Sequence, residues 1–115
     1  MGRGDNMSTQ AFTKTGNTVV FTAATSAPTP VQCVSTTLGG NQYRIINAGS
    51  ITVFLGYGVT SLDATNNAVI VTSTGSAFPL LAGTDEILTF VPNAYFTGIT
   101  ASSTASVYIT PGDGM

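Results

Sequence analysis

Histidine and tryptophan are absent from this 115-residue sequence, and Cys33 is its only cysteine. Without histidine, the chain lacks the commonest general base and the commonest metal-binding side chain. A serine or cysteine nucleophile has no imidazole to activate it, and Lys14 alone is thin support for a Ser–Lys pair. Zinc is excluded because too few ligands are present. We therefore expect neither enzymatic activity nor a cofactor.

Charged side chains are also scarce, at 7% of the residues, whereas ordinary soluble domains have about 25%. The basic residues Arg3, Lys14 and Arg44 form no cluster that could neutralise phosphates, so nucleic acid is excluded as a partner. A surface with so little charge does not repel a neighbouring molecule. We predict a protein that works in contact with other protein. The alternative is a neutral, threonine-rich monomer.

Long apolar runs are missing as well. The first ten residues, MGRGDNMSTQ, lack the apolar segment of a signal peptide. No run approaches the roughly 20 residues that span a membrane, so we expect no membrane partner. A single cysteine forms no internal disulfide, and Cys33 lies in a strand-like pattern, where we predict a buried side chain. These features favour synthesis in a cytoplasm.

The pattern that is present consists of short runs of Val, Ile, Phe, Tyr and Thr, separated by Gly, Asn, Pro and Ser. No stretch has apolar residues at helical spacing, so we predict no helix of useful length. The predicted strands span residues 18–23, 31–37, 42–47, 50–56, 68–74, 86–91, 95–101 and 105–110, with another short one near 10–15. About eight short strands predict an all-β, antiparallel sandwich or a small barrel.

Residues 1–10 carry no strand pattern, so we divide the chain into an N-terminal arm, 1–10, and a β-domain, 11–115. The arm contains Arg3-Gly4-Asp5, a tripeptide that some integrins recognise. In a chain made in a cytoplasm, we interpret this segment instead as an arm that is solvated or held by a partner. Arg3 would then pair with a carboxylate on a neighbour.

The stretch YRIINAGSITVFLGYG, residues 43–58, predicts a hairpin with a four-residue loop at 47–50. In that register one face carries Tyr43, Ile45, Thr52 and Phe54, and the other carries Arg44, Ile46, Ile51, Val53 and Leu55. Neither face is polar, although a sandwich buries only one face of each sheet. We therefore predict that a partner or another subunit covers the second face. The alternative is that a long loop of the same chain covers it.

Two further motifs carry little chemistry. Asp85 and Glu86 are the only adjacent acids; on a strand they would point to opposite faces, and we interpret them as a solvated turn. The alternative is a calcium site with Asp63 or backbone carbonyls, although the sequence shows no calcium loop. The stretch 56–61, GYGVTS, resembles a phosphate loop only superficially, because it lacks a third glycine and a following helix. We predict a bulge or bend there.

Four segments of the chain follow one another in a recognisable order: Asn-Ala-Gly-Ser, Ile-Thr-Val-Phe-Leu-Gly-Tyr-Gly, Gly-Thr-Asp-Glu-Ile-Leu-Thr-Phe and Ala-Ser-Val-Tyr-Ile-Thr-Pro-Gly-Asp-Gly. With them, residues 40–114 resemble small structural proteins of tailed bacteriophages. Such proteins are often capsid decoration, or cement, proteins. The resemblance implies a single-domain β-sandwich of jelly-roll type on the capsid exterior. It also implies that the protein binds the major capsid protein and itself, as a homodimer or homotrimer, and stabilises the shell.

For this role we expect the contact residues to be Arg3, Asp5, Tyr43, Ile45, Phe54 and Tyr57. A second hypothesis is a carbohydrate- or receptor-binding module of a phage tail or fibre. It would use exposed side chains such as Tyr43, Tyr57, Asn93 and Tyr95. The absence of tryptophan, the strongest platform for stacking a sugar, weighs against it.

Overall fold

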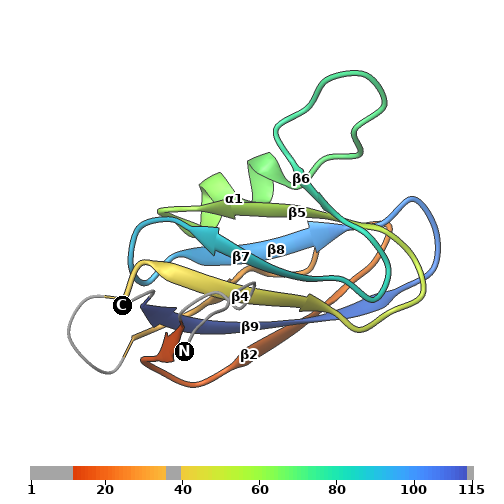
Figure 1. Ribbon diagram of the computed structural model, residues 1–115. Coiled ribbons are helices and arrows are strands. Elements are labelled where there is room, and N and C mark those ends of the chain that lie inside the picture. Colours follow the sequence, from red (N-terminus) through yellow and green to blue (C-terminus); the bar gives the residue numbers. More distant parts are fainter. Residues whose placement is uncertain (1–11, 36–39, 114–115) are drawn as a thin grey trace.

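The computed structural model describes residues 12–35 and 40–113 (Figure 1). The predicted arm, with Arg3 and Asp5, lies outside the described residues. So do the start of the short strand expected near 10–15 and the end of the one expected at 31–37. The described part forms a sandwich of two antiparallel sheets and one short helix.

The first sheet contains β1 (Thr13–Lys14), β2 (Val19–Ala23), β4 (Gln42–Asn47), β7 (Asp85–Thr89) and β9 (Ala105–Asp113). The second sheet contains β3 (Val31–Gln32), β5 (Val53–Gly58), β6 (Phe78–Leu80) and β8 (Tyr95–Ile99). The strand orders are β2-β9-β4-β7 and β3-β8-β5-β6, with β1 also paired to β9. This arrangement is that of a jelly roll. The predicted all-β sandwich of jelly-roll type is confirmed.

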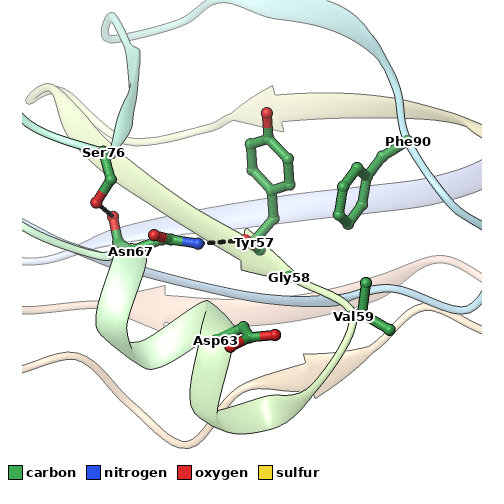
Figure 2. Close-up of a pocket in the computed structure, with 7 residues that line it drawn as sticks. All are labelled: Tyr57, Gly58, Val59, Asp63, Asn67, Ser76 and Phe90. Carbon is green, nitrogen blue, oxygen red and sulfur yellow. Dashed lines mark hydrogen bonds between the residues drawn. The ribbon is translucent and has the colours of Figure 1, made fainter.

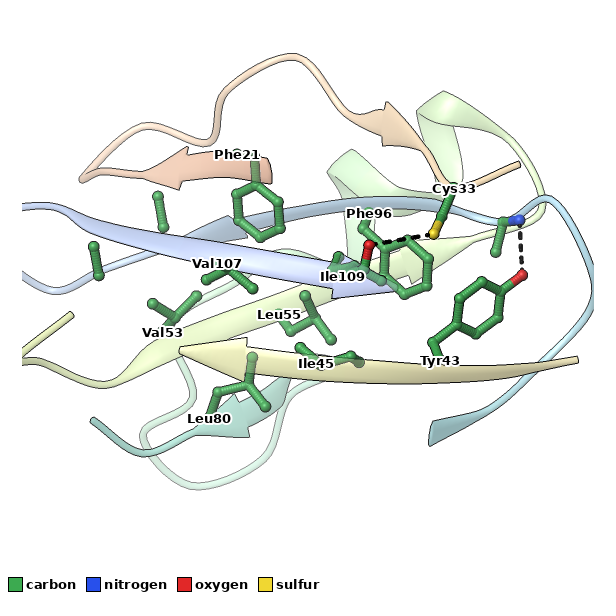
Figure 3. Packing of buried hydrophobic residues seen from close by; sticks show 13 residues of the cluster. Phe21, Cys33, Tyr43, Ile45, Val53, Leu55, Leu80, Phe96, Val107 and Ile109 are labelled. Carbon is green, nitrogen blue, oxygen red and sulfur yellow. Dashed lines mark hydrogen bonds between the residues drawn. The ribbon is translucent and has the colours of Figure 1, made fainter. Parts of the chain in front are cut away.

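The core lies between the two sheets (Figure 3). Alternate residues of each strand point inward, so the period-2 pattern of β9 buries Val107 and Ile109 and leaves Tyr108 outside. The largest fully buried apolar side chains are Tyr43, Ile45, Val53, Leu55, Leu80, Phe96, Val107 and Ile109. Each such side chain contributes about 1.5–3 kcal/mol when it leaves water. A core of this size stabilises the sandwich without a disulfide.

The predicted hairpin between residues 43 and 58 is wrong. Strand β4 pairs with β9 and β7, whereas β5 pairs with β8 and β6, so the two strands belong to different sheets. Residues 48–52 cross from one sheet to the other. Both strands turn an apolar face to the shared core, and each is central in its sheet. Strand β4 alternates in burial, with Tyr43, Ile45 and Asn47 inside and Arg44 exposed, although the outward Ile46 is apolar.

Asn47 holds this crossover in place. Its side chain is fully buried, and its Nδ2 donates to the carbonyl oxygens of Ile51 and Leu80 at 2.9 and 3.0 Å. Its Oδ1 accepts from the N–H of Gly49 at 3.0 Å. One carboxamide therefore satisfies buried backbone groups on the crossover and on the end of β6.

A helix, α1 (Ser61–Asn67), follows β5, so the prediction of no useful helix is wrong. Thr60 caps it by accepting from the N–H of Asp63 at 3.1 Å. The helix packs on the outer face of the second sheet against β5 and β8 (Figure 1). Gly56 permits this contact, because a Cβ there would lie 2.3 Å from the carbonyl oxygen of Ala64. The chain thus covers part of its own second face, as the alternative interpretation of the apolar runs proposed.

The strand predicted at 68–74 is also absent. That segment is part of a loop that projects from the body between α1 and β6 (Figure 1). The apolar run has strand-like composition, but Val69 and Val71 lie against Gly75 within the loop. The strand on this edge is β6, which the sequence pattern did not indicate because Pro79 lies at its centre.

We predict that Asn47→Asp lowers the free energy of unfolding at pH 7 by about 3 kcal/mol or more, because a buried carboxylate would face carbonyl oxygens. Burial raises the pKa of such a carboxyl, so the loss should shrink as the pH falls and the group is protonated in the folded state. Urea unfolding at pH 7 and pH 4 measures both effects. The matched control is Asn66→Asp, on the exposed surface of α1. Equal losses at the two positions would contradict the role of Asn47.

Candidate functional site

Two of the predicted contact residues, Tyr43 and Ile45, are fully buried in the core, so their assignment to a partner surface is wrong. Both point inward from β4 because this strand faces β5 across the sandwich rather than beside it. The Tyr43 hydroxyl donates to the carbonyl oxygen of Val91 at 2.5 Å and accepts from the N–H of Ala94 at 3.1 Å. Burial raises the pKa of Tyr43. Tyr43 therefore fixes the turn between β7 and β8.

Phe54 and Tyr57 are half-buried and reach the surface on opposite sides of β5. Phe54 lies on the outer face of the second sheet, with Pro79 and Ile99 as its neighbours on the adjacent strands. Tyr57 points to the inner rim, where Phe96 is its partner on β8. The structure therefore does not bring Tyr43, Ile45 and Phe54 together on one face.

A chain of aromatic rings connects the core to the surface at this end of β5. The ring centroids of Tyr43 and Phe96 are 4.9 Å apart, those of Phe96 and Tyr57 6.2 Å, and those of Tyr57 and Phe90 4.9 Å. Aromatic pairs at these spacings contribute beyond their buried area. The chain holds Tyr57 and Phe90 in fixed positions at the surface.

A pocket of about 250 Å³ lies beside these two rings, where β5 ends. Its lining residues are Tyr57, Gly58, Val59, Asp63, Asn67, Ser76 and Phe90 (Figure 2). The Nδ2 of Asn67 donates to the carbonyl oxygen of Tyr57 at 3.0 Å. The Ser76 hydroxyl donates to the carbonyl oxygen of Asn67 at 3.5 Å. The pocket is therefore built from β5, α1, the following loop and the segment after β7.

The charge in this pocket is negative. Asp63 supplies a carboxylate, and no basic residue lines the walls. In the ranges 12–35 and 40–113, the basic residues are Lys14 on β1 and Arg44 on β4. Arg44 is already paired: its Nη2 lies 2.5 Å from Oδ2 of Asp85, and this hydrogen bond lowers the pKa of the Asp85 carboxyl. Asp63 has no such partner among the described residues.

The glycines of the stretch 56–61 resemble those of a phosphate loop, but the structure gives them another role. A helix does follow it, contrary to our expectation, but the helix has only seven residues. A Cβ on Gly58 would lie 2.4 Å from Cβ of Asp63, so this glycine permits close packing of the helix on the strand. The carboxylate of Asp63 disfavours an anion at this place. The glycines are therefore explained by packing, not by phosphate binding.

Exposed apolar side chains line the pocket or lie next to its lining residues in the sequence. Val59 lines it at 57% exposure, Leu62 precedes Asp63 on α1 at 68%, and Val91 follows Phe90 at 40%. We call the pocket, together with Val59, Leu62 and Val91, the pocket end of the sandwich. The sequence pattern did not indicate this surface. Its only signal is a single leucine among the polar residues of 60–67.

A second apolar region lies on the outer face of the first sheet. Tyr108 is 42% exposed and is flanked by Val20 on β2 and Ile46 on β4. The adjacent acids Asp85 and Glu86 begin strand β7 rather than forming a turn, although both are exposed as expected. Asp85 pairs with Arg44 on this same sheet.

The remaining side chains proposed for sugar binding have other partners. Asn93 occupies the turn before β8 with a positive φ of 59°, and its Oδ1 accepts from the N–H of Ser35 at 3.0 Å. Tyr95 is half-buried and pairs across the sheet with Gly58. Within the described ranges, no three His, Cys, Asp or Glu side chains gather where they could hold a metal ion. None of the described helices has the length and apolarity to span a membrane.

We predict that Cys33 does not react with iodoacetamide at pH 8 in the native protein and reacts fully in denaturant. The prediction that Cys33 is buried is confirmed; its Sγ donates to the carbonyl oxygen of Ile109 at 3.6 Å. Burial raises the pKa of Cys33 to about 12, so the reactive thiolate is rare at pH 8. Mass spectrometry of both samples measures the labelling. Rapid labelling of the native protein would contradict this account.

We predict that Tyr43→Phe lowers the free energy of unfolding by about 1–3 kcal/mol, because it leaves the backbone groups of Val91 and Ala94 without their partner. The matched control is Tyr108→Phe on the outer face, which should change the free energy by less than about 0.5 kcal/mol. Chemical denaturation measures both variants. A loss at Tyr108 as large as the loss at Tyr43 would show that the buried hydrogen bonds are not the cause.

Comparison with known proteins leaves the function to be inferred from the molecule itself. The chain matches no protein-family model, and no curated protein or solved structure matches it. A jelly roll hosts many unrelated functions, so the fold alone does not assign one. The chemistry of the surface is what distinguishes them.

Proposed function

We propose that this protein is a structural subunit of a bacteriophage particle, a decoration protein that binds the outer surface of the capsid and stabilises it. The observation that carries the proposal is the exterior of the sandwich. It has few charges and many exposed apolar side chains, among them those of the pocket end and the row formed by Val20, Tyr108 and the half-buried Ile46. Such a surface fits lasting contact with other protein subunits. The resemblance over residues 40–114 supports the same role.

Two separate apolar regions fit the two contacts that a decoration protein makes. One contact joins copies of the chain into a dimer or trimer, and the other attaches that oligomer to the major capsid protein. We assign the first to the outer face of the first sheet, where the flat row on β2, β9 and β4 can meet its own copy. We assign the second contact, with the major capsid protein, to the pocket end.

The stabilising mechanism in this proposal is mechanical. A specific protein interface buries about 800 Å² on each partner. When one oligomer attaches at several points, each later contact forms within an already bound complex, and the combined attachment is far tighter than any single one. A rigid sandwich transmits load between the capsid subunits that it bridges, because close-packed interiors are hard to compress.

A carbohydrate- or receptor-binding module remains the second candidate, and the pocket is the observation that favours it. Tyr57 and Phe90 offer aromatic surface, and Asp63 and Asn67 offer polar groups beside it. The pocket of about 250 Å³ is, however, smaller than the roughly 300–1,000 Å³ typical of small-molecule sites. The size of the pocket therefore favours a single protein side chain.

We predict that purified protein added to capsids that lack it sediments with them and occupies regular positions over the shell. The capsids should then open at a higher temperature than undecorated ones, since bound subunits bridge the lattice. Sedimentation, electron cryomicroscopy and thermal scanning measure the three effects. Density only at the tail tip would favour the receptor-binding candidate, and no binding would reject the proposal.

The variant Tyr108→Ser tests the assigned oligomer contact within the same assay. Loss of the ring should shift the protein toward the monomer and weaken capsid binding through lost multivalency. The matched control is Thr22→Ser, an exposed position on β2 of the same sheet. Analytical ultracentrifugation gives the oligomeric state of each variant.

A further inference from the structure

We infer that the pocket at the end of β5 receives one basic side chain, lysine or arginine, from a partner protein. That the partner is the capsid rests on the proposed function; the preference for a cation rests on the pocket itself.

The pocket is small. At about 250 Å³, the pocket is below the usual range for small-molecule sites and is open to the surface. It has room for one long side chain. Val59 lines the pocket and is 57% exposed, so its apolar surface would shield part of the entering side chain from water.

The charge of the pocket favours a cation. Asp63 lines the pocket, and its carboxylate forms no hydrogen bond or ion pair within the described part of the chain. Its backbone N–H, in contrast, is bound to the Thr60 hydroxyl, which fixes the residue at the first turn of α1. The Asp63 side chain is exposed, and a carboxylate without a partner attracts a cation and repels phosphate or sulfate. Among the described residues, the strands of the second sheet, on which α1 packs, carry no basic side chain.

Two aromatic rings in the pocket also favour a cation. Tyr57 and Phe90 meet edge to face, with ring planes at 76°. Such a contact uses the face of only one of the two rings, so aromatic surface remains along the pocket (Figure 2). A guanidinium or ammonium group is attracted to an aromatic face, and its aliphatic stem packs well on Val59.

The free edge of β5 beside the pocket is capped, so strand addition by a partner is not the main contact. Strand β6 pairs with β5 only over Val53–Leu55, so β5 continues past the end of its neighbour. An extended partner segment could in principle pair with that free edge. The side chain of Asn67 already occupies the position, because its Nδ2 donates to the carbonyl oxygen of Tyr57 at 3.0 Å. Such a cap protects an edge against further pairing. A side chain, not a strand, is therefore the occupant.

The experiment titrates the ¹⁵N-labelled protein with the capped tripeptides acetyl-Gly-Arg-Gly-amide and acetyl-Gly-Lys-Gly-amide and follows the amide shifts. Shifts should concentrate at Gly58, Val59, Asp63 and Asn67, and affinity should fall as salt is added. The neutral probe acetyl-Gly-citrulline-Gly-amide has nearly the shape of the arginine peptide and should bind at least about fivefold more weakly. Equal binding of the citrulline peptide would overturn the inference. So would shifts caused by methyl glucoside in place of the basic peptides.

Asp63→Asn should weaken binding of the basic peptides about fivefold, because it removes the charge at nearly constant shape. Phe90→Leu tests the ring while it keeps an apolar side chain at the position. The matched control is Glu86→Gln, which removes one exposed carboxylate on β7 and should leave binding unchanged. Circular dichroism melting shows that each variant is folded. Unchanged binding by folded Asp63→Asn would overturn the inference.

The same variants in the capsid assay separate this inference from the proposed function. If the wild type binds capsids and Asp63→Asn binds equally well, the pocket is not the contact, although the proposed function stands. If the basic peptides bind through Asp63 but the protein does not bind capsids, the proposed function fails and the inference that the pocket binds a basic side chain stands. Weaker capsid binding by Asp63→Asn, with Glu86→Gln unaffected, supports both.

Discussion

The crossover between the two sheets is the constraint on which the rest of the structure depends, and the carboxamide of Asn47 holds it. Because the chain changes sheets directly after β4, the inner faces of β4 and β5 meet across the core rather than side by side. Tyr43, Ile45, Val53 and Leu55 then become one buried cluster instead of two apolar surfaces. The partly buried backbone groups of the crossover have an internal hydrogen-bond partner. Asn47 supplies that partner on both its donor and acceptor sides.

The same crossover determines where the surface site can form. It places β5 in the second sheet, where Gly56 and Gly58 leave room for α1 to lie against the strand. The helix brings Asp63 to the end of β5, and the aromatic chain through Phe96 brings Tyr57 and Phe90 to the other side of the pocket. The site is thus a consequence of packing at several levels. No contiguous motif encodes it.

These dependencies explain what the sequence could and could not predict. Short β-branched runs between turn residues predicted the described strands other than β6 near their observed places, because that pattern depends on local backbone preference. The buried state of Cys33 was predictable for the same reason. The pairing of β4 was not, since its partners β9 and β7 are distant in the chain and a four-residue turn at 47–50 is an equally good local solution. The site depended on that pairing, so Tyr43 and Ile45 were placed on a surface, whereas Leu62 and Phe90 were missed.

Hydrogen–deuterium exchange of the protein, free and bound to capsids, tests the central claim most directly. That claim is that the pocket end is the surface that meets the shell. The account predicts slower exchange on binding at residues 57–63 and 90–91, with no change at the opposite end of the sandwich, residues 48–52 and 81–84. Protection confined to the opposite end, or absent from residues 57–63 while the protein stays bound, would contradict it.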